Sequence, residues 1–122
     1  MSPTISPDRM ERYRESARRR EEFNRIELDT RRKRGWELAH QAADILKKEF
    51  GAERVVVFGS LLSADLFHRQ SDIDLGGWNI QDLSAAAARL VDLDASFDFD
   101  LVSVDDIHPE LLAVIEAEGV EL

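Results

Sequence analysis

The stretch VVVFGSLLSADLFHRQSDID, residues 55–74, decides how the middle of this chain folds. It opens on a short β-branched apolar run, which predicts a buried strand. The glycine-serine pair Gly59-Ser60 ends that run, because a glycine lets the chain turn tightly after a strand. Asp72 and Asp74 close the stretch and alternate with apolar residues, which predicts a second strand with one polar face.

Upstream of this stretch the chain has the composition of a long helix. Between about residues 8 and 50 there is no proline, and Arg, Glu, Lys, Ala and Leu dominate. Residues 1–34 carry many charges and only a thin apolar stripe, so they have little to bury against their own domain. We expect them to form a charged helical extension, either an arm packed on a partner or a second copy, or a partly disordered segment.

The next part of the helix differs, because its apolar residues recur at helical spacing and should face a core. These residues are Trp36, Ala39, Ala42, Ala43, Leu46 and Phe50. Gly51 then provides a C-terminal cap. We therefore place a folded domain over residues 35–122.

The remainder of the domain alternates between helical and strand patterns. Residues 61–66 have room for one or two helical turns, and an alanine-rich helix is predicted over 82–91. A third strand follows at about 97–104, and a last helix at 110–118 stops at a glycine. The element order predicts an α/β fold, with a small mixed sheet of about three strands flanked by helices and a long charged N-terminal helix.

Composition narrows the class of protein. The 122 residues suit one domain, and the absence of cysteine excludes disulfides, thiol nucleophiles and cysteine-ligated zinc. No apolar run is long enough for a membrane span, and the first ten residues lack a signal-peptide core, so we expect a cytoplasmic protein without a membrane partner. The net charge of −9 is uneven: residues 1–50 hold 13 Lys/Arg and 10 Asp/Glu, whereas residues 51–122 hold 3 and 15. This acidic second part makes nucleic acid an unlikely direct substrate.

The acidic residues of the predicted strands suggest a metal site. Asp72 and Asp74 stand two positions apart, so a strand points both side chains to the same face. Two carboxylates repel each other unless a cation neutralises them, and Mg²⁺ prefers carboxylate and phosphate oxygens. The third predicted strand carries Asp98 and Asp100, which also share a face; we favour Asp100, which leads directly into an apolar pair. Three such acids suit metal-assisted phosphoryl or nucleotidyl transfer.

Other polar residues give weaker signals. Gly59 and Ser60 can hold phosphate oxygens through bare amides and a hydroxyl. His68 and Arg69 follow in the intervening loop and are secondary candidates for a phosphate contact. Trp78 could stack on a base or simply pack. The RRKR run at 31–34 suits either a nucleic-acid patch or the end of a helix.

Together, the motifs VVVFGS, SDIDL and FDFDLV resemble the minimal nucleotidyltransferase (MNT) family of the polymerase β-like superfamily. The resemblance covers about Trp36 to Leu122 and implies a nucleotidyltransferase fold. It implies that Gly59 and Ser60 bind the nucleotide. It also implies that Asp72, Asp74 and Asp100 are the catalytic, metal-binding acids, with Mg²⁺ as cofactor and ATP as donor.

The same resemblance implies a partner. Small proteins of this family are often the antitoxin of a HEPN/MNT toxin–antitoxin pair, in which the MNT protein binds a HEPN ribonuclease and active members transfer AMP to it. We therefore expect a hetero-oligomer with such a toxin. The chain departs from the family at Ser63-Ala64, where many members have Arg-Gly.

Two alternatives stay open on the sequence alone. In one, the chain is a non-catalytic module that silences its partner by covering it with the charged arm. In the other, it transfers a nucleotide to RNA or to a small molecule, although 122 residues leave no room for a separate substrate-binding domain.

Overall fold

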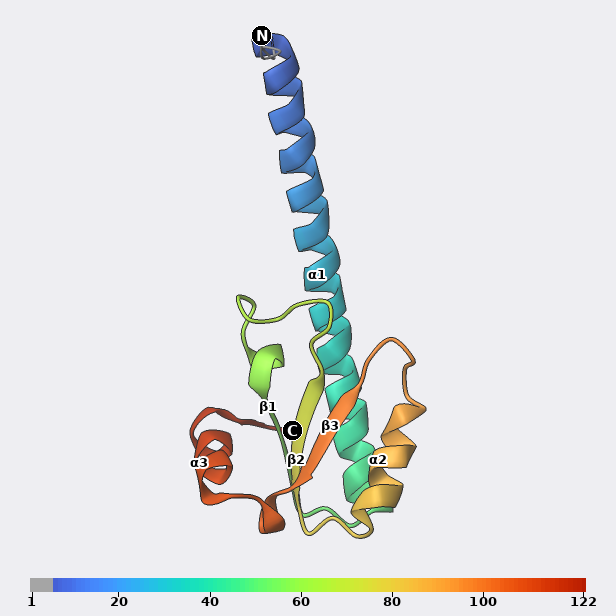
Figure 1. The fold of residues 1–122 in the computed structure, drawn as a ribbon. Helices are drawn as coiled ribbons and strands as arrows, with labels where there is room; N and C mark the ends of the chain where they lie inside the picture. The colour runs from blue at the N-terminus through green and yellow to red at the C-terminus, as the bar shows by residue number, and fades with distance from the viewer. Residues whose placement is uncertain (1–5) are drawn as a thin grey trace.

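One long helix runs through most of the length of the molecule (Figure 1). In the computed structural model, which describes residues 6–122, helix α1 spans Pro7–Glu49. The first five residues of the predicted extension lie outside the described residues. At 1.5 Å per residue, a helix of 43 residues is about 65 Å long.

The two ends of α1 follow from local sequence. Ser6 caps the N-terminus, where its side chain accepts a hydrogen bond from the backbone N–H of Arg9, and Pro7 occupies the first helical position. At the other end Gly51 has a φ of +68°, which confirms its predicted capping role. The helix has no break between residues 34 and 35, so the charged arm continues directly into the core-facing part.

Four strands form a mixed sheet in the order β3-β2-β1-β4. Strands β1 (Arg54–Phe58) and β2 (Ile73–Trp78) are antiparallel, whereas β2 and β3 (Phe99–Ser103) are parallel. The three predicted strands are confirmed. The fourth, β4 (Val120–Glu121), pairs antiparallel with the outer side of β1 and was not predicted, because two residues are too short to show an alternating pattern.

Helix α2 spans Leu83–Val91 and α3 spans Pro109–Glu118, both close to the predicted ranges. The helical turns expected at 61–66 begin earlier than predicted, as a single 3₁₀ turn, η1 (Gly59–Leu62), which starts at the glycine itself. A second 3₁₀ turn, η2 (Val104–Asp106), follows β3.

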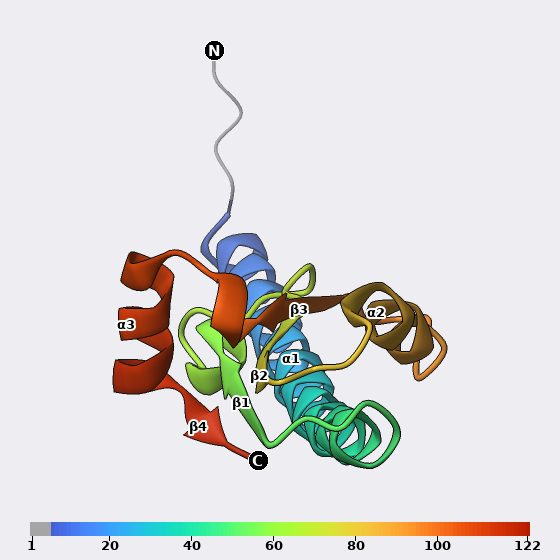
Figure 2. The ribbon, with the colours of Figure 1, turned by 90° about the horizontal axis from the view of Figure 1, so that it is seen from below.

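The main core lies between the sheet and two helices. Residues of α1 and α2 pack with Val55, Val57, Ile73 and Leu75, which alternate along β1 and β2. The opposite face of the sheet is covered only in part. There, Ile115 of α3 lies close to Gly76 and to neighbouring strand residues. Figure 2 shows α3 on one side of the strands and α2 on the other, with β4 at the edge of the sheet beside β1.

The predicted core positions of α1 are largely confirmed. Ala39, Ala42, Ala43 and Leu46 are buried, and Trp36 and Phe50 are partly buried against the same core. Leu38 is also fully buried although the helical pattern did not single it out. Within residues 6–122, no helix has an apolar stretch long enough to cross a bilayer.

Candidate active site

Three acidic residues meet at one end of the sheet because of the strand register. Asp74 is the second residue of β2 and Asp100 the second residue of β3, and the parallel pairing sets these two residues side by side. Asp72 lies immediately before β2, two residues from Asp74, so in extended chain both side chains point to the same face. All three belong to the sheet face opposite the α1 core, because Ile73 and Leu75 point into that core.

The three carboxylates influence one another electrostatically. Partial burial, followed by the negative charges of Asp100 and Asp72, raises the pKa of Asp74 from 3.8 to about 6. The structure also distinguishes Asp98 from Asp100, which the two-residue spacing alone assigns to the same face of the third strand. Asp98 lies before β3, where its backbone carbonyl accepts a hydrogen bond from the N–H of Ile73 at 2.9 Å. Asp100 is therefore the acid of this strand that stands beside Asp74.

The glycine-serine turn adjoins this cluster. Phe58, at the end of β1, pairs with Asp74 across the sheet, so the next residue, Gly59, lies against the Asp74 carboxylate. A Cβ at position 59 would collide with Asp74 Oδ2, and the backbone φ of +77° also favours glycine. Ser60 follows inside the 3₁₀ turn and is half-buried. The structure thus brings Gly59, Asp72 and Asp100 close to Asp74, and Ser60 is the next residue along the turn.

The donor chemistry of the cluster suits a divalent cation, since carboxylate oxygens are the ligands that Mg²⁺ takes in proteins. Within residues 6–122, however, no group of three or more His, Cys, Asp or Glu side chains is arranged so that it could hold a metal ion. Burial and, after it, repulsion from Asp100 and Asp72 raise the pKa of Asp74, and this repulsion also favours separation of the carboxylates. The assignment of these acids as metal ligands therefore stays a proposal.

Several weaker candidates lie elsewhere. Arg69 turns toward α1, where its Nη2 donates to Asn24 Oδ1 at 3.1 Å and to Glu27 Oε2 at 3.2 Å, and not toward the acids. Trp78 is at the opposite end of β2 from the acids, with the guanidinium of Arg54 4.2 Å from its ring centre. In this structure Trp78 packs against Arg54, away from the acids.

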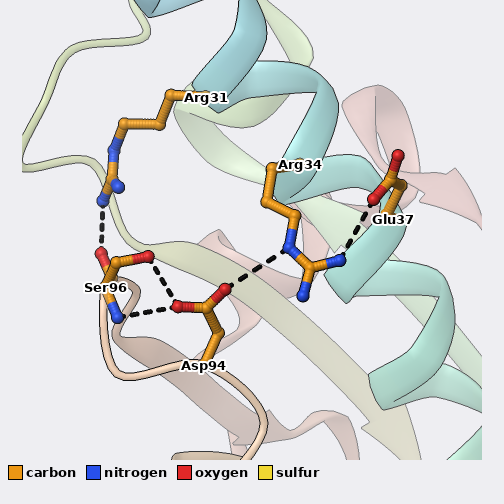
Figure 3. A network of polar contacts seen from close by, with 5 residues as sticks. All are labelled: Arg31, Arg34, Glu37, Asp94 and Ser96. Carbon is orange, nitrogen blue, oxygen red and sulfur yellow. Dashed lines mark hydrogen bonds and ion pairs between the residues drawn. The ribbon is translucent and has the colours of Figure 1, made fainter.

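The RRKR run lies in the middle of α1, so the prediction that it could mark a helix end is wrong. Two of its arginines connect the helix to the loop before β3 (Figure 3). Arg31 Nη2 donates to the backbone carbonyl of Ser96 at 2.6 Å, and Arg34 contacts Asp94 at 3.3 Å and Glu37 at 3.1 Å.

The loop that receives these arginines is itself ordered by hydrogen bonds. Asp94 Oδ1 accepts the backbone N–H of Ser96 at 2.8 Å and the Ser96 hydroxyl at 2.6 Å. These bonds, together with Arg34, keep the pKa of Asp94 below its usual range. The sequence did not point to this network, because its partners stand about sixty residues apart; the only signal was the density of arginines in the run.

Comparisons with known proteins support the fold. No protein-family model and no curated protein matches the chain. The chain is similar to a solved crystal structure of a mutant of the toxin–antitoxin pair MntA–HpeT, with a TM-score of 0.54 and 22% identity over 68% of this chain and 70% of that one. The mutant carries two aspartate-to-glutamate changes two positions apart. At this identity the likeness confirms the predicted α/β, nucleotidyltransferase-like fold.

Proposed function

We propose that the chain is a Mg²⁺-dependent nucleotidyltransferase that transfers AMP from ATP to a partner protein and thereby neutralises a HEPN-type ribonuclease toxin. The observation that carries this proposal is the convergence of Asp72, Asp74 and Asp100 beside the turn at Gly59. The toxin–antitoxin pair among similar structures supports the antitoxin role. Its mutated aspartates have the same two-residue spacing as Asp72 and Asp74.

In the proposed reaction, the oxygen of an acceptor hydroxyl forms a bond to the α-phosphorus of ATP. The bond from that phosphorus to the bridging oxygen breaks, so pyrophosphate leaves and AMP stays on the acceptor. The hydroxyl proton passes to a carboxylate of the cluster, for which exposed Asp100 is the candidate.

The protein supplies position and charge for this step. Asp72, Asp74 and Asp100 would hold Mg²⁺, which neutralises charge on the phosphates when it is bound. The backbone of Gly59 and the hydroxyl of Ser60 would hold phosphate oxygens. Because Gly59 has no side chain, this backbone can stand directly beside the acids.

Labelling tests the proposal. With ATP labelled at the α-phosphate, we expect label on the partner toxin, and we expect Asp72→Asn or Asp74→Asn to abolish it. Asp98→Asn is the matched control, because this exposed acid lies outside the pair formed by β2 and β3. Undiminished labelling by both Asp72→Asn and Asp74→Asn would exclude the assigned mechanism.

A non-catalytic antitoxin is the second candidate. It is favoured by the exposed arm, in which nearly every side chain from Ser6 to Glu27 lies in solvent. It is also favoured because no group of three or more His, Cys, Asp or Glu side chains within residues 6–122 is arranged to hold a metal ion. The Ser63-Ala64 departure from the family also favours a non-catalytic antitoxin. On this reading, Asp72→Asn and Asp74→Asn still neutralise the toxin in co-expressing cells, whereas removal of residues 1–22 ends the protection.

A further inference from the structure

A cavity of about 600 Å³ opens where the arm meets the domain, on the side of α1 that faces the loop before β3. Its wall combines three guanidinium groups with apolar and hydroxyl side chains. The residues that matter are Ile26, Arg31, Arg34, Arg69, Ser96 and Phe97. We call this cavity, together with the adjoining exposed Phe23, the arm–loop groove.

Apolar surface continues from the cavity along the arm. Phe23 lies one helical turn before Glu27, which also lines the cavity, so both belong to one side of α1. The side chains of Phe23 and Ile26 are 61% and 54% exposed. Two large apolar side chains so exposed beside a cavity are typical of a surface that another protein covers.

The arginines give the groove a positive character on an acidic molecule. Arg31 lies with its guanidinium carbon 3.9 Å from the ring centre of Phe97, and its Nε is buried without a hydrogen-bond partner in the described part of the chain. Arg34 pairs with exposed Glu37 and with partly buried Asp94, and Arg69 pairs with exposed Glu27 and donates to Asn24. The two exposed pairs, Arg34–Glu37 and Arg69–Glu27, contribute little and exchange readily. A ligand with carboxylates can therefore pair with these two guanidinium groups in bidentate geometry.

The groove lies near the three acids along the chain. Arg69 precedes Asp72 by three residues, and Phe97 precedes Asp100 by three. Both loops reach the same end of the sheet, because Ile73 and Phe99 are partners at the start of β2 and β3. A segment bound in the groove would thus lie at the same end of the sheet as the acids, on the α1 side, and would reach them around that end.

We propose that the arm–loop groove is the docking site for an acidic segment of the acceptor protein. Carboxylates of this segment pair with Arg34 and Arg69, and an apolar side chain packs on Phe23 and Ile26. The inference rests on the proposed function in taking the docked protein as the acceptor of AMP; the docking itself needs no nucleotide.

A protein segment suits the groove better than a nucleic acid. The groove is bordered by Glu27, Glu37 and Asp94, and Asp72, Asp74 and Asp100 lie at the same end of the sheet. A phosphate backbone carries a negative charge at every nucleotide and would bring many of them past these acids, whereas a short peptide brings only a few carboxylates. A peptide places a few carboxylates at chosen points and brings its own apolar side chains.

The test uses a fluorescein-labelled copolymer of glutamate and tyrosine, with a lysine–tyrosine copolymer as the opposite charge, and fluorescence anisotropy without nucleotide. We expect the full chain to bind only the acidic copolymer. Arg34→Ala/Arg69→Ala should weaken binding about tenfold, since each lost charge-assisted contact removes a factor of a few. Arg14→Ala/Arg18→Ala, which removes the same charge from the exposed arm, should change the affinity less than about twofold.

Phe23→Ser tests the apolar part and cannot disturb the core, because this side chain is mostly in solvent. It should weaken binding severalfold and leave the unfolding midpoint unchanged. Equal affinity of the groove variants and the arm control would overturn the inference. Tighter binding of a labelled oligouridylate, lost in Arg34→Ala/Arg69→Ala, would also overturn it in favour of RNA.

The outcomes separate the two proposals. If the acidic copolymer binds in the groove but takes no label from ATP, docking stands and the proposed transfer to protein hydroxyls is contradicted. If label reaches its tyrosines equally in the wild type and in the groove variants, transfer stands and the groove assignment fails.

Discussion

At the scale of single residues, Asp74 combines partial burial with two like charges, and it should make stability depend on pH. Its pKa of about 6 lies above the ordinary value of 3.8, so the folded state binds a proton more tightly than the unfolded state. The stability that this proton provides is complete below about pH 4 and is lost as the pH rises through about 6.

Asp74→Asn should therefore stabilise the protein at neutral pH. A shift of two units corresponds to about 2.7 kcal/mol, which solvent screening of a half-exposed group reduces to about 1 kcal/mol. We expect urea unfolding to show this gain at about pH 7.5 and almost none at about pH 4. Asp98→Asn serves as the control. A gain of the same size at both pH values would contradict this account of Asp74.

Gly59 provides a second test at this scale, with Gly51 as its matched control. Both residues have a positive φ, +77° and +68°, so alanine should cost each about 1 kcal/mol in the free energy of unfolding. At position 51 the new Cβ would meet the end of the flexible Gln81 side chain at 2.9 Å, whereas at position 59 it would collide with the Asp74 carboxylate. Gly59→Ala should therefore lose binding of a fluorescent ATP analogue, whereas Gly51→Ala should retain it. Equal binding by both variants would show that the turn does not hold the nucleotide.

Much of the candidate site was visible in the sequence because its residues cluster in two short segments with strong local patterns. Parity alone could not separate Asp98 from Asp100; the register between β2 and β3 was needed. The contacts of Arg69 and Arg31 were beyond prediction, because they depend on where distant loops pass along α1.

At the scale of elements, α1 has two parts: an N-terminal part exposed to solvent and a C-terminal part packed against the core. Its side chains are almost all exposed up to Glu27, and Leu28 is the first to pack against the core. Beyond Leu28, Arg31 donates a hydrogen bond to the carbonyl of Ser96, and Arg32 Nε donates to the carbonyl of Leu61 in η1 at 2.9 Å.

This division predicts unequal effects of two truncations. Removal of residues 1–22 should change the free energy of unfolding by less than about 0.5 kcal/mol, because nearly all of residues 6–22 are exposed. Removal of residues 1–34 should destabilise the domain by several kcal/mol, since it also deletes Leu28 and the arginine contacts. Chemical denaturation measures both. If the two truncated proteins are equally stable, the folded domain begins at residue 35, as the sequence predicted, and Leu28 and the arginine contacts add nothing to its stability.

At the scale of the whole molecule, the sheet depends on its last residues to cover one edge. Strand β4 lies along β1, whose centre reads Val55-Val56-Val57, and Leu122 N–H donates to the Val55 carbonyl at 2.9 Å. Without this cover, an apolar strand edge would be open to pairing with other chains.

Deletion of residues 120–122 should therefore promote aggregation as well as lower stability by about 1–2 kcal/mol. Size-exclusion chromatography over time should show loss of the starting species, with Glu118→Gln, an exposed change at the end of α3, as the control. A deletion variant that elutes unchanged and keeps its unfolding midpoint would show that β4 is dispensable.

The overall architecture could be predicted because each long element carries its own pattern: alternation in β2 and β3, helical spacing in α1, and capping residues around α2. What escaped prediction was β4 and the early start of η1. Both are short, and tertiary pairing rather than local sequence determines them.

The continuity of α1 has one more consequence. Because the arm and the core-facing segment are one helix, the arm's angular orientation about the axis is fixed relative to the carboxylates. Each inserted residue would turn the outer arm by about 100° and lift it by about 1.5 Å. The arm thus fixes both the direction and the distance at which a protein bound to its outer part is held. Two inserted residues would rotate that protein to the opposite side of the molecule. Seven would leave its direction nearly unchanged but move it about 10 Å farther along the helix axis.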